Sequence, residues 1–214
     1  MPRFLTCWLL LALAWPSIPS AEPLDRQWRF TVLLNGKPIG HHHVDLAKRG
    51  DDVEYQSETR LDVKILFINV YSYLHTDAES WRDDCLTKIE SSTNDNGKRE
   101  FVRGARAAAS FKIETPKGAS ELAAPCIMTF AYWNPRILTA TRLMNAQTGA
   151  EVPVRITALG KDTVLANGAE IAAEHYAIVG EKLNIELWYA QGEWVALATT
   201  TERGERLQYQ LRER

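Results

Sequence analysis

The chain has 214 residues, of which 45% are hydrophobic and 24% charged, and its formal net charge at neutral pH is −2. This balance is typical of a globular protein and excludes the strongly basic surface of a nucleic-acid binder, so no nucleic-acid partner is expected. After residue 21, no stretch is apolar for long enough to cross a membrane as a helix.

The first 21 residues have the three parts of a secretory signal peptide. Arg3 gives a short basic start, Phe4 to Trp15 is apolar, and the small residues Ser20 and Ala21 follow two prolines. The apolar run is shorter than the roughly twenty residues that a spanning helix needs. We therefore expect a cleaved signal peptide at 1–21, a single β-rich domain at 22–214, and a periplasmic or secreted protein. A retained N-terminal anchor is the alternative.

Two cysteines, Cys85 and Cys126, remain after the expected cleavage. In an oxidising compartment, an even pair predicts a disulfide. It would close a loop of about 40 residues and stabilise the fold by about 3–4 kcal/mol. Two separate buried thiols are the alternative.

Most of the chain alternates apolar and polar residues, which is the period of a strand with one buried face. In the clearest case, Tyr55, Thr59 and Leu61 share one face, and the charged residues of the same segment share the other. Asn35–Gly36 and Gly160–Asp162 predict turns. Strands are expected at 28–34, 40–46, 53–65, 86–92, 101–103, 109–114, 152–159, 171–179, 183–189, 194–200 and 207–211.

One segment departs from the strand pattern. Asn134 and Pro135 are favoured residues for a helix start, and apolar residues then recur at helical spacing as far as Met144. We expect a helix near 135–146 that flanks the sheet. The predicted fold is mainly β, a strongly curved antiparallel sheet forming a half-barrel or open barrel with that single helix.

Two groups of titratable residues have the spacing of a strand face: one comprises His41, His43 and Asp45, the other His75, Asp77 and Glu79. On neighbouring strands they could bind a metal ion, whereas on a solvated face they would have no such role. The sequence lacks a nucleophile elbow, a zinc-binding H-E-x-x-H and a phosphate-binding loop. We therefore assign no catalytic residues, no metal ligands and no cofactor.

The strongest candidates for ligand contacts are aromatic. Tyr132 and Trp133 precede the expected helix, and Arg136 would add a cation suited to an anionic headgroup. Phe67 and Tyr71 belong to a stretch, 65–74, that is apolar on both faces and must be covered by protein or meet an apolar partner. The alternative is a capped helix with buried aromatic residues.

Several short segments carry a family resemblance. They are Leu34–Gly40, Ser92–Gly97, Tyr132–Pro135, Asn145–Gly149, Leu187–Tyr189 and Leu207–Leu211. Together they resemble an uncharacterised family of exported bacterial β-rich proteins, a domain of unknown function, over essentially the whole mature chain. The architecture is also similar to the lipoprotein-carrier-like half-barrels of the bacterial envelope, which hold acyl chains between a curved sheet and several helices.

These observations favour a non-enzymatic binding or envelope-accessory protein whose curved sheet holds an apolar or lipid-like small molecule. Two alternatives stay open. One is an envelope hydrolase or metal-dependent enzyme that uses the His and carboxylate residues, and the other is a structural or interaction protein with a fully packed core. The sequence predicts no oligomeric state.

Overall fold

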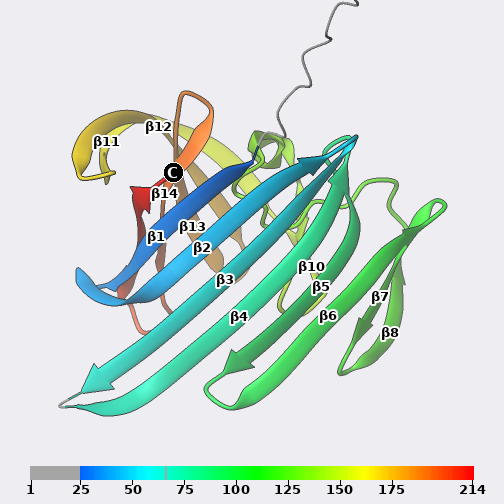
Figure 1. Cartoon of the computed structure of the whole chain (residues 1–214), viewed down its shortest axis with the longest axis horizontal. Helices are drawn as coiled ribbons and strands as arrows, with labels where there is room; N and C mark the ends of the chain where they lie inside the picture. Colours follow the sequence, from blue (N-terminus) through cyan, green and yellow to red (C-terminus); the bar gives the residue numbers. More distant parts are fainter. Residues whose placement is uncertain (1–24, 66) are drawn as a thin grey trace, which may run out of the picture.

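The computed structural model describes residues 25–65 and 67–214, so the predicted signal peptide lies outside the described residues. Thirteen strands form one antiparallel sheet in the order β11-β12-β13-β14-β15-β1-β2-β3-β4-β5-β6-β7-β8 (Figure 1). The prediction of a mainly β protein with a large antiparallel sheet is therefore confirmed. No helix of the described chain is long and apolar enough to span a membrane.

Most of the expected strands are present and extend further than expected, but the strand expected at 152–159 is divided in two, and the strands at 68–82, 118–122 and 142–144 were not among the expected ranges. The strands are β1 Arg26–Leu34, β2 Lys37–Arg49, β3 Asp52–Ile65, β4 Ile68–Arg82, β5 Cys85–Asp95, β6 Lys98–Ala107, β7 Ser110–Thr115, β8 Gly118–Leu122, β9 Arg142–Met144, β10 Glu151–Pro153, β11 Arg155–Ala166, β12 Ala169–Gly180, β13 Leu183–Ala190, β14 Glu193–Thr200 and β15 Arg206–Glu213.

The sheet is open but strongly curved. Its edges are β8 and β11, and the first and last strands, β1 and β15, pair in its interior. The turn after β11 reaches back to β15, where the Asn167 amide donates to the Leu211 carbonyl at 2.9 Å. In Figure 1, β2 to β6 form a broad front, and β11 to β14 curl behind β1. This curvature creates an inner face.

The inner face is covered by residues 123–154, which we call the covering segment. Two hydrophobic clusters hold it there. Ile137 and Leu143 pack with Trp28, Leu187 and other residues of the β1 and β13–β15 side. On the other side, a second cluster joins the covering segment to β4–β7, and it comprises Trp81, Leu86, Ile89, Val102, Phe111, Ile113, Ile127, Ala131 and Met144.

The predicted helix over 135–146 was wrong: the described residues contain only the short 3₁₀ helix η1, Pro135–Thr139. The predicted start is present, since the Asn134 side chain accepts from the Arg136 amide at 3.0 Å. The element ends at Ala140, which is extended. Residues 142–144 then pair with β10. The β-branched residues Thr139 and Thr141 disfavour a helix, and pairing with β10 offers the backbone another set of partners.

The turn expected at Gly160–Asp162 was also wrong. Strand β11 continues through it with an irregular register at Ala158 and Gly160, and the chain reverses at Asn167–Gly168 instead. Gly160 has φ +106°, so its backbone adopts the conformation of a bulge that glycine tolerates best. The true turn is an Asn-Gly pair, the stronger hairpin signal.

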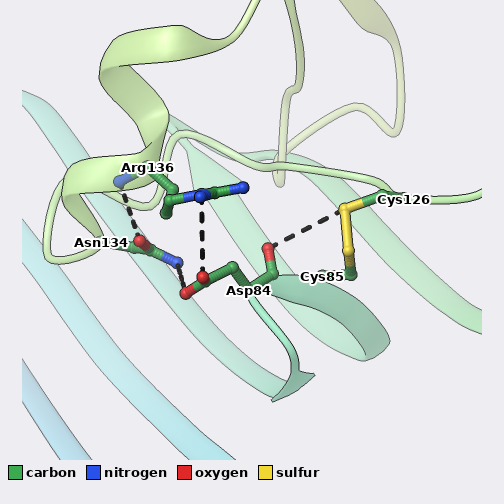
Figure 2. The surroundings of a disulfide bond; sticks show 5 residues. All are labelled: Asp84, Cys85, Cys126, Asn134 and Arg136. Atoms are coloured by element: carbon green, nitrogen blue, oxygen red, sulfur yellow. Dashed lines mark hydrogen bonds and ion pairs between the residues drawn. A yellow bond between two sulfur atoms is a disulfide. The ribbon is translucent and has the colours of Figure 1, made fainter.

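The predicted disulfide between Cys85 and Cys126 is confirmed, with Cα atoms 5.0 Å apart. It joins the first residue of β5 to the covering segment, and the Leu86 amide donates to the Ile127 carbonyl at 3.0 Å beside it. Figure 2 shows the bond next to Asp84, which also contacts Asn134 and Arg136. The crosslink therefore tethers the covering segment to the start of β5.

Replacing both cysteines in the variant Cys85→Ser/Cys126→Ser should lower the free energy of unfolding by about 4 kcal/mol, because a loop of 41 residues is no longer closed in the unfolded chain. Urea denaturation of the oxidised protein measures this change. A reductant should destabilise the unmodified protein and leave the double variant unaffected. Equal unfolding free energies for the disulfide-bonded protein and the double variant would contradict a stabilising role.

Candidate functional site

A row of polar residues crosses the inner face of four neighbouring strands. His42, Thr59, His75 and Thr93 are successive partners across β2, β3, β4 and β5. Side chains directly opposite in a sheet point to the same face, so the row forms a continuous strip. His42 Nδ1 lies 2.6 Å from Thr59 Oγ1, and His75 Nδ1 lies 2.8 Å from Thr93 Oγ1. Each imidazole is thus oriented by a threonine of the next strand.

Two carboxylic acids lie beside this strip on β4. Asp77 is opposite Ser57 of β3, and Glu79 is opposite Tyr55. Because both are an even number of residues from His75, they share its inward-facing side of the strand. Only 7% of Asp77 and 3% of Glu79 is exposed, which is unusual for charged residue types.

These side chains line a cavity of about 210 Å³ between the inner face and the covering segment. Tyr132 forms part of the cover, and its carbonyl accepts a 2.7 Å hydrogen bond from Tyr189 Oη. Tyr73 Oη donates to Gln147 Oε1 at 3.2 Å and so links β4 to the cover. The lining consists of His42, Tyr55, Ser57, Thr59, Tyr73, His75, Asp77, Glu79, Thr129, Phe130, Ala131, Tyr132, Asn145, Ala146, Gln147 and Tyr209.

Both imidazoles in the cavity are uncharged at neutral pH. Burial lowers the pKa of His42 to about 3, and the neighbouring histidines, His75 foremost, act in the same direction. Burial also lowers the pKa of His75 to about 4. Protonation of either ring would place a cation in a site that solvates it poorly, so both act as neutral hydrogen-bonding groups.

The pKa values of the two acids are shifted upward, in the opposite direction to those of the histidines. Burial raises the pKa of Glu79 to about 7, against the opposing effect of hydrogen bonds from Thr129, Trp81 and Asp77. The Trp81 indole Nε1 donates to Glu79 Oε2 at 2.8 Å. Burial, followed by the proximity of Glu79, raises the pKa of Asp77 well above its usual range. Because the two acids interact, they titrate as a pair, and both keep their protons to a higher pH than ordinary carboxyl groups do.

One carboxylate oxygen of this pair has no partner. Asp77 Oδ1 is fully enclosed and makes no hydrogen bond within the described chain. A buried polar atom without a partner costs free energy, about 1–3 kcal/mol for a typical group. Such a defect in the wall of a cavity indicates a place where a bound molecule or ordered water completes the structure.

The two groups predicted from strand spacing lie on opposite faces of the sheet. His75, Asp77 and Glu79 line the cavity together. The group of His41, His43 and Asp45 lies on the outer face, where His41 stacks on His43 and its Nε2 is 3.1 Å from a carboxylate oxygen of β3. No group of three or more His, Cys, Asp or Glu within 25–65 and 67–214 is arranged to hold a metal ion.

His42 was missed as a functional candidate, although the signal was present. It lies between Gly40 and Val44 on the face that the alternation marks as buried, and Ser57 and Thr59 occupy the matching face of the next strand. A histidine and two hydroxyl residues on buried faces are costly unless they form a network. This combination of residue type and buried face is the signal that identifies the polar strip.

The residues proposed to contact a ligand are dispersed. Tyr132 lines the cavity, and Trp133 stacks on the cavity residue Tyr55 with ring centroids 6.2 Å apart. Arg136 lies outside the lining, where its Nε is 3.7 Å from Asp84 Oδ2 near the disulfide (Figure 2). Ligand contact by these three residues stays a prediction.

The other two candidates lie toward the hairpin that joins β3 and β4. Phe67 is fully exposed there, and Ile68 and Val70 are 67% and 46% exposed. Tyr71 belongs to β4, two residues before the lining residue Tyr73 and outside the lining itself. The side chains of Phe67, Ile68 and Val70 are therefore not covered by other described parts of the chain, whereas Tyr71 and Tyr73 of the same stretch are half-buried.

Comparisons with known proteins agree with the fold. Residues 30–212 match the model of a family described as a domain of unknown function, DUF6134. The chain is also similar to a solved β-barrel-like protein of the domain of unknown function DUF1849 from Brucella abortus, with a TM-score of 0.62, 9% identity, and coverage of 88% of this chain and 95% of that one. At this identity the likeness concerns the fold alone. No curated protein matches the chain. The expected resemblance to an uncharacterised β-rich family is confirmed.

The variant Glu79→Gln should change how stability depends on pH. The folded-state pKa of Glu79, about 7, exceeds the ordinary value of 4.5, so its stabilising contribution is complete below pH 4.5 and is lost as the pH rises through 7. Glutamine does not ionise. Relative to the unmodified protein, the variant should therefore gain on the order of 3 kcal/mol between pH 4.5 and pH 8.

Urea denaturation of both proteins at several pH values measures that difference. Glu114→Gln is the matched control, because it makes the same substitution at an exposed position of β7, outside the cavity. Parallel profiles for Glu79→Gln and the unmodified protein would show that Glu79 ionises normally.

Proposed function

The chain belongs to the DUF6134 family, and from the geometry of its inner cavity we propose that it is a periplasmic or secreted binding protein. The ligand is a small molecule held between the curved sheet and the covering segment. The disulfide supports an exported location, because such bonds persist in oxidising compartments. The predicted signal peptide supports the same location.

The observation that carries the proposal is the enclosed, unpartnered Asp77 Oδ1 in the wall of the cavity. A purely structural core would replace Asp77 and Glu79 with apolar residues, because burying acids without cationic partners destabilises the fold. Their presence beside His42 and His75 gives the cavity both hydrogen-bond donors and hydrogen-bond acceptors. This is the composition of a site that orients a polar ligand.

The size of the cavity limits which ligands it can hold. Its volume of about 210 Å³ is smaller than that of pockets for drug-sized ligands, which measure about 300–1,000 Å³. An acyl chain of lipid length needs more room than this. The geometry therefore supports a small polar ligand better than the apolar or lipid-like one that the sequence suggested.

Filling the cavity should abolish binding. The variant Ser57→Leu introduces a larger apolar side chain on the inner face beside Asp77, and Gln56→Leu makes the matched change one residue earlier on the outer face. Thermal melting in the presence of a panel of small polar metabolites, with native mass spectrometry of any stabilising compound, identifies ligands. A ligand should raise the melting temperature of the unmodified protein and of Gln56→Leu, and should leave Ser57→Leu unchanged.

The proposal fails if no compound in the panel stabilises the protein, or if Ser57→Leu responds as strongly as the control. Mass spectrometry of the recovered ligand separates binding from catalysis. An acid with a pKa near 7 is also suited to general acid–base chemistry, so conversion of the ligand would identify an enzyme instead.

A further inference from the structure

The inner cavity is lined by acids that have no cationic partner in the described part of the chain. Asp77 and Glu79 line it together, and none of its described lining residues is Arg or Lys. We propose that the ligand is a small protonated amine whose ammonium group binds at Asp77 and Glu79. This inference rests on the proposed binding function and adds the charge and the functional group of the ligand.

The hydrogen-bonding inventory favours an ammonium group. Glu79 Oε2 already accepts from the Trp81 indole, and the Ser91 hydroxyl of the next strand donates to the Ala146 carbonyl. Asp77 Oδ1 lacks a donor among the described residues. A primary ammonium brings three N–H donors and a positive charge, so it supplies both the missing hydrogen bond and the missing counter-charge.

The walls of the cavity suit the rest of such a molecule. Four tyrosines line it, from β3, β4, β15 and the covering segment: Tyr55, Tyr73, Tyr209 and Tyr132. Aromatic faces attract cations and also pack against short alkyl chains. The Tyr209 ring meets His42 edge to face at 5.4 Å, and the Tyr73 ring stacks on His75 at 6.3 Å, so the aromatic wall is continuous with the polar strip.

The other titratable groups that line the cavity are neutral. Burial raises the pKa of Tyr209 to about 12, and burial likewise raises the pKa of Tyr55, Tyr73 and Tyr132 above the usual range. The histidines of β2 and β4 are neutral because burial lowers the pKa of each. The negative charge that the described lining offers to a ligand therefore comes from the pair of Asp77 and Glu79.

A bound ammonium would lower the pKa of both acids, because an opposite charge favours the ionised form. Binding would therefore release a proton wherever the empty site is protonated. The affinity should rise with pH by up to about tenfold per pH unit for each proton released, through pH 7 where Glu79 titrates, since an alkylammonium stays protonated there with a pKa of about 10.

The test uses the disulfide-bonded protein and two probes with equal numbers of non-hydrogen atoms, n-butylammonium and 1-butanol, with butyrate as the anionic probe. Titrations followed by NMR give the dissociation constants at pH 5, 6, 7 and 8. n-Butylammonium should bind at least tenfold more tightly than 1-butanol or butyrate at pH 8. Calorimetry in two buffers of different ionisation enthalpy should show proton release at pH 6.

Asp77→Asn should weaken n-butylammonium binding at least tenfold and reduce its pH dependence. The matched control Asp45→Asn removes an acid from the outer face and should bind as the unmodified protein does. The NMR spectrum checks that each variant is folded. If Asp77→Asn does not fold, the proton-release measurement on the unmodified protein still decides the question.

Three results would overturn the inference: equal affinity for the amine and the alcohol, no proton release, or unchanged binding by Asp77→Asn. In each case a neutral or anionic metabolite whose binding is abolished by Ser57→Leu would leave the proposed function standing. If neither the three probes nor any metabolite binds in the cavity, both proposals fail together.

Discussion

The pairing of β1 with β15 is the interaction on which the rest of the structure depends. It joins strands from opposite ends of the described chain, and the Asn35 and Arg206 segments lock its end with reciprocal hydrogen bonds of 2.8 and 2.9 Å. Through it, β11–β15 and β1–β8 become one sheet, whose curvature encloses an inner face. It also brings Tyr209 of β15 against His42 of β2, so the cavity draws on both halves of the sheet.

The inner face combines two kinds of packing that have opposite energetic consequences. On either side, Trp28 and Trp81 belong to apolar clusters whose burial stabilises the fold. Between them, the His42 strip and the two acids are removed from water with only part of their hydrogen bonds completed. Each perturbed pKa there measures a loss of favourable solvation. A fold retains such a region at a cost to stability, which is why the centre of the sheet, and not its apolar flanks, is the candidate site.

Period-two alternation predicted most of the sheet, because the order of apolar and polar residues within each strand indicates which of its faces is buried. It also separated His41 from His42 correctly, yet residue type drew attention to the outer histidines and away from the inner one. The prediction of a helix was wrong for a different reason. Asn134 and Pro135 begin a helical turn whether the element is a short 3₁₀ helix or a longer α-helix, and pairing with β10 decides the conformation of the residues after that turn. Neither this pairing nor the β1–β15 contact has a local signal, so the cavity that depends on both could not be located from the sequence.

The covering segment links the redox state of the protein to its candidate site. It contains little regular structure, and it is held by scattered apolar residues such as Ile137 and Leu143 and by the bond from Cys126 to β5. The same segment contributes Thr129, which hydrogen-bonds Glu79, and Tyr132, which walls the cavity. The disulfide therefore holds in place the segment that covers the site.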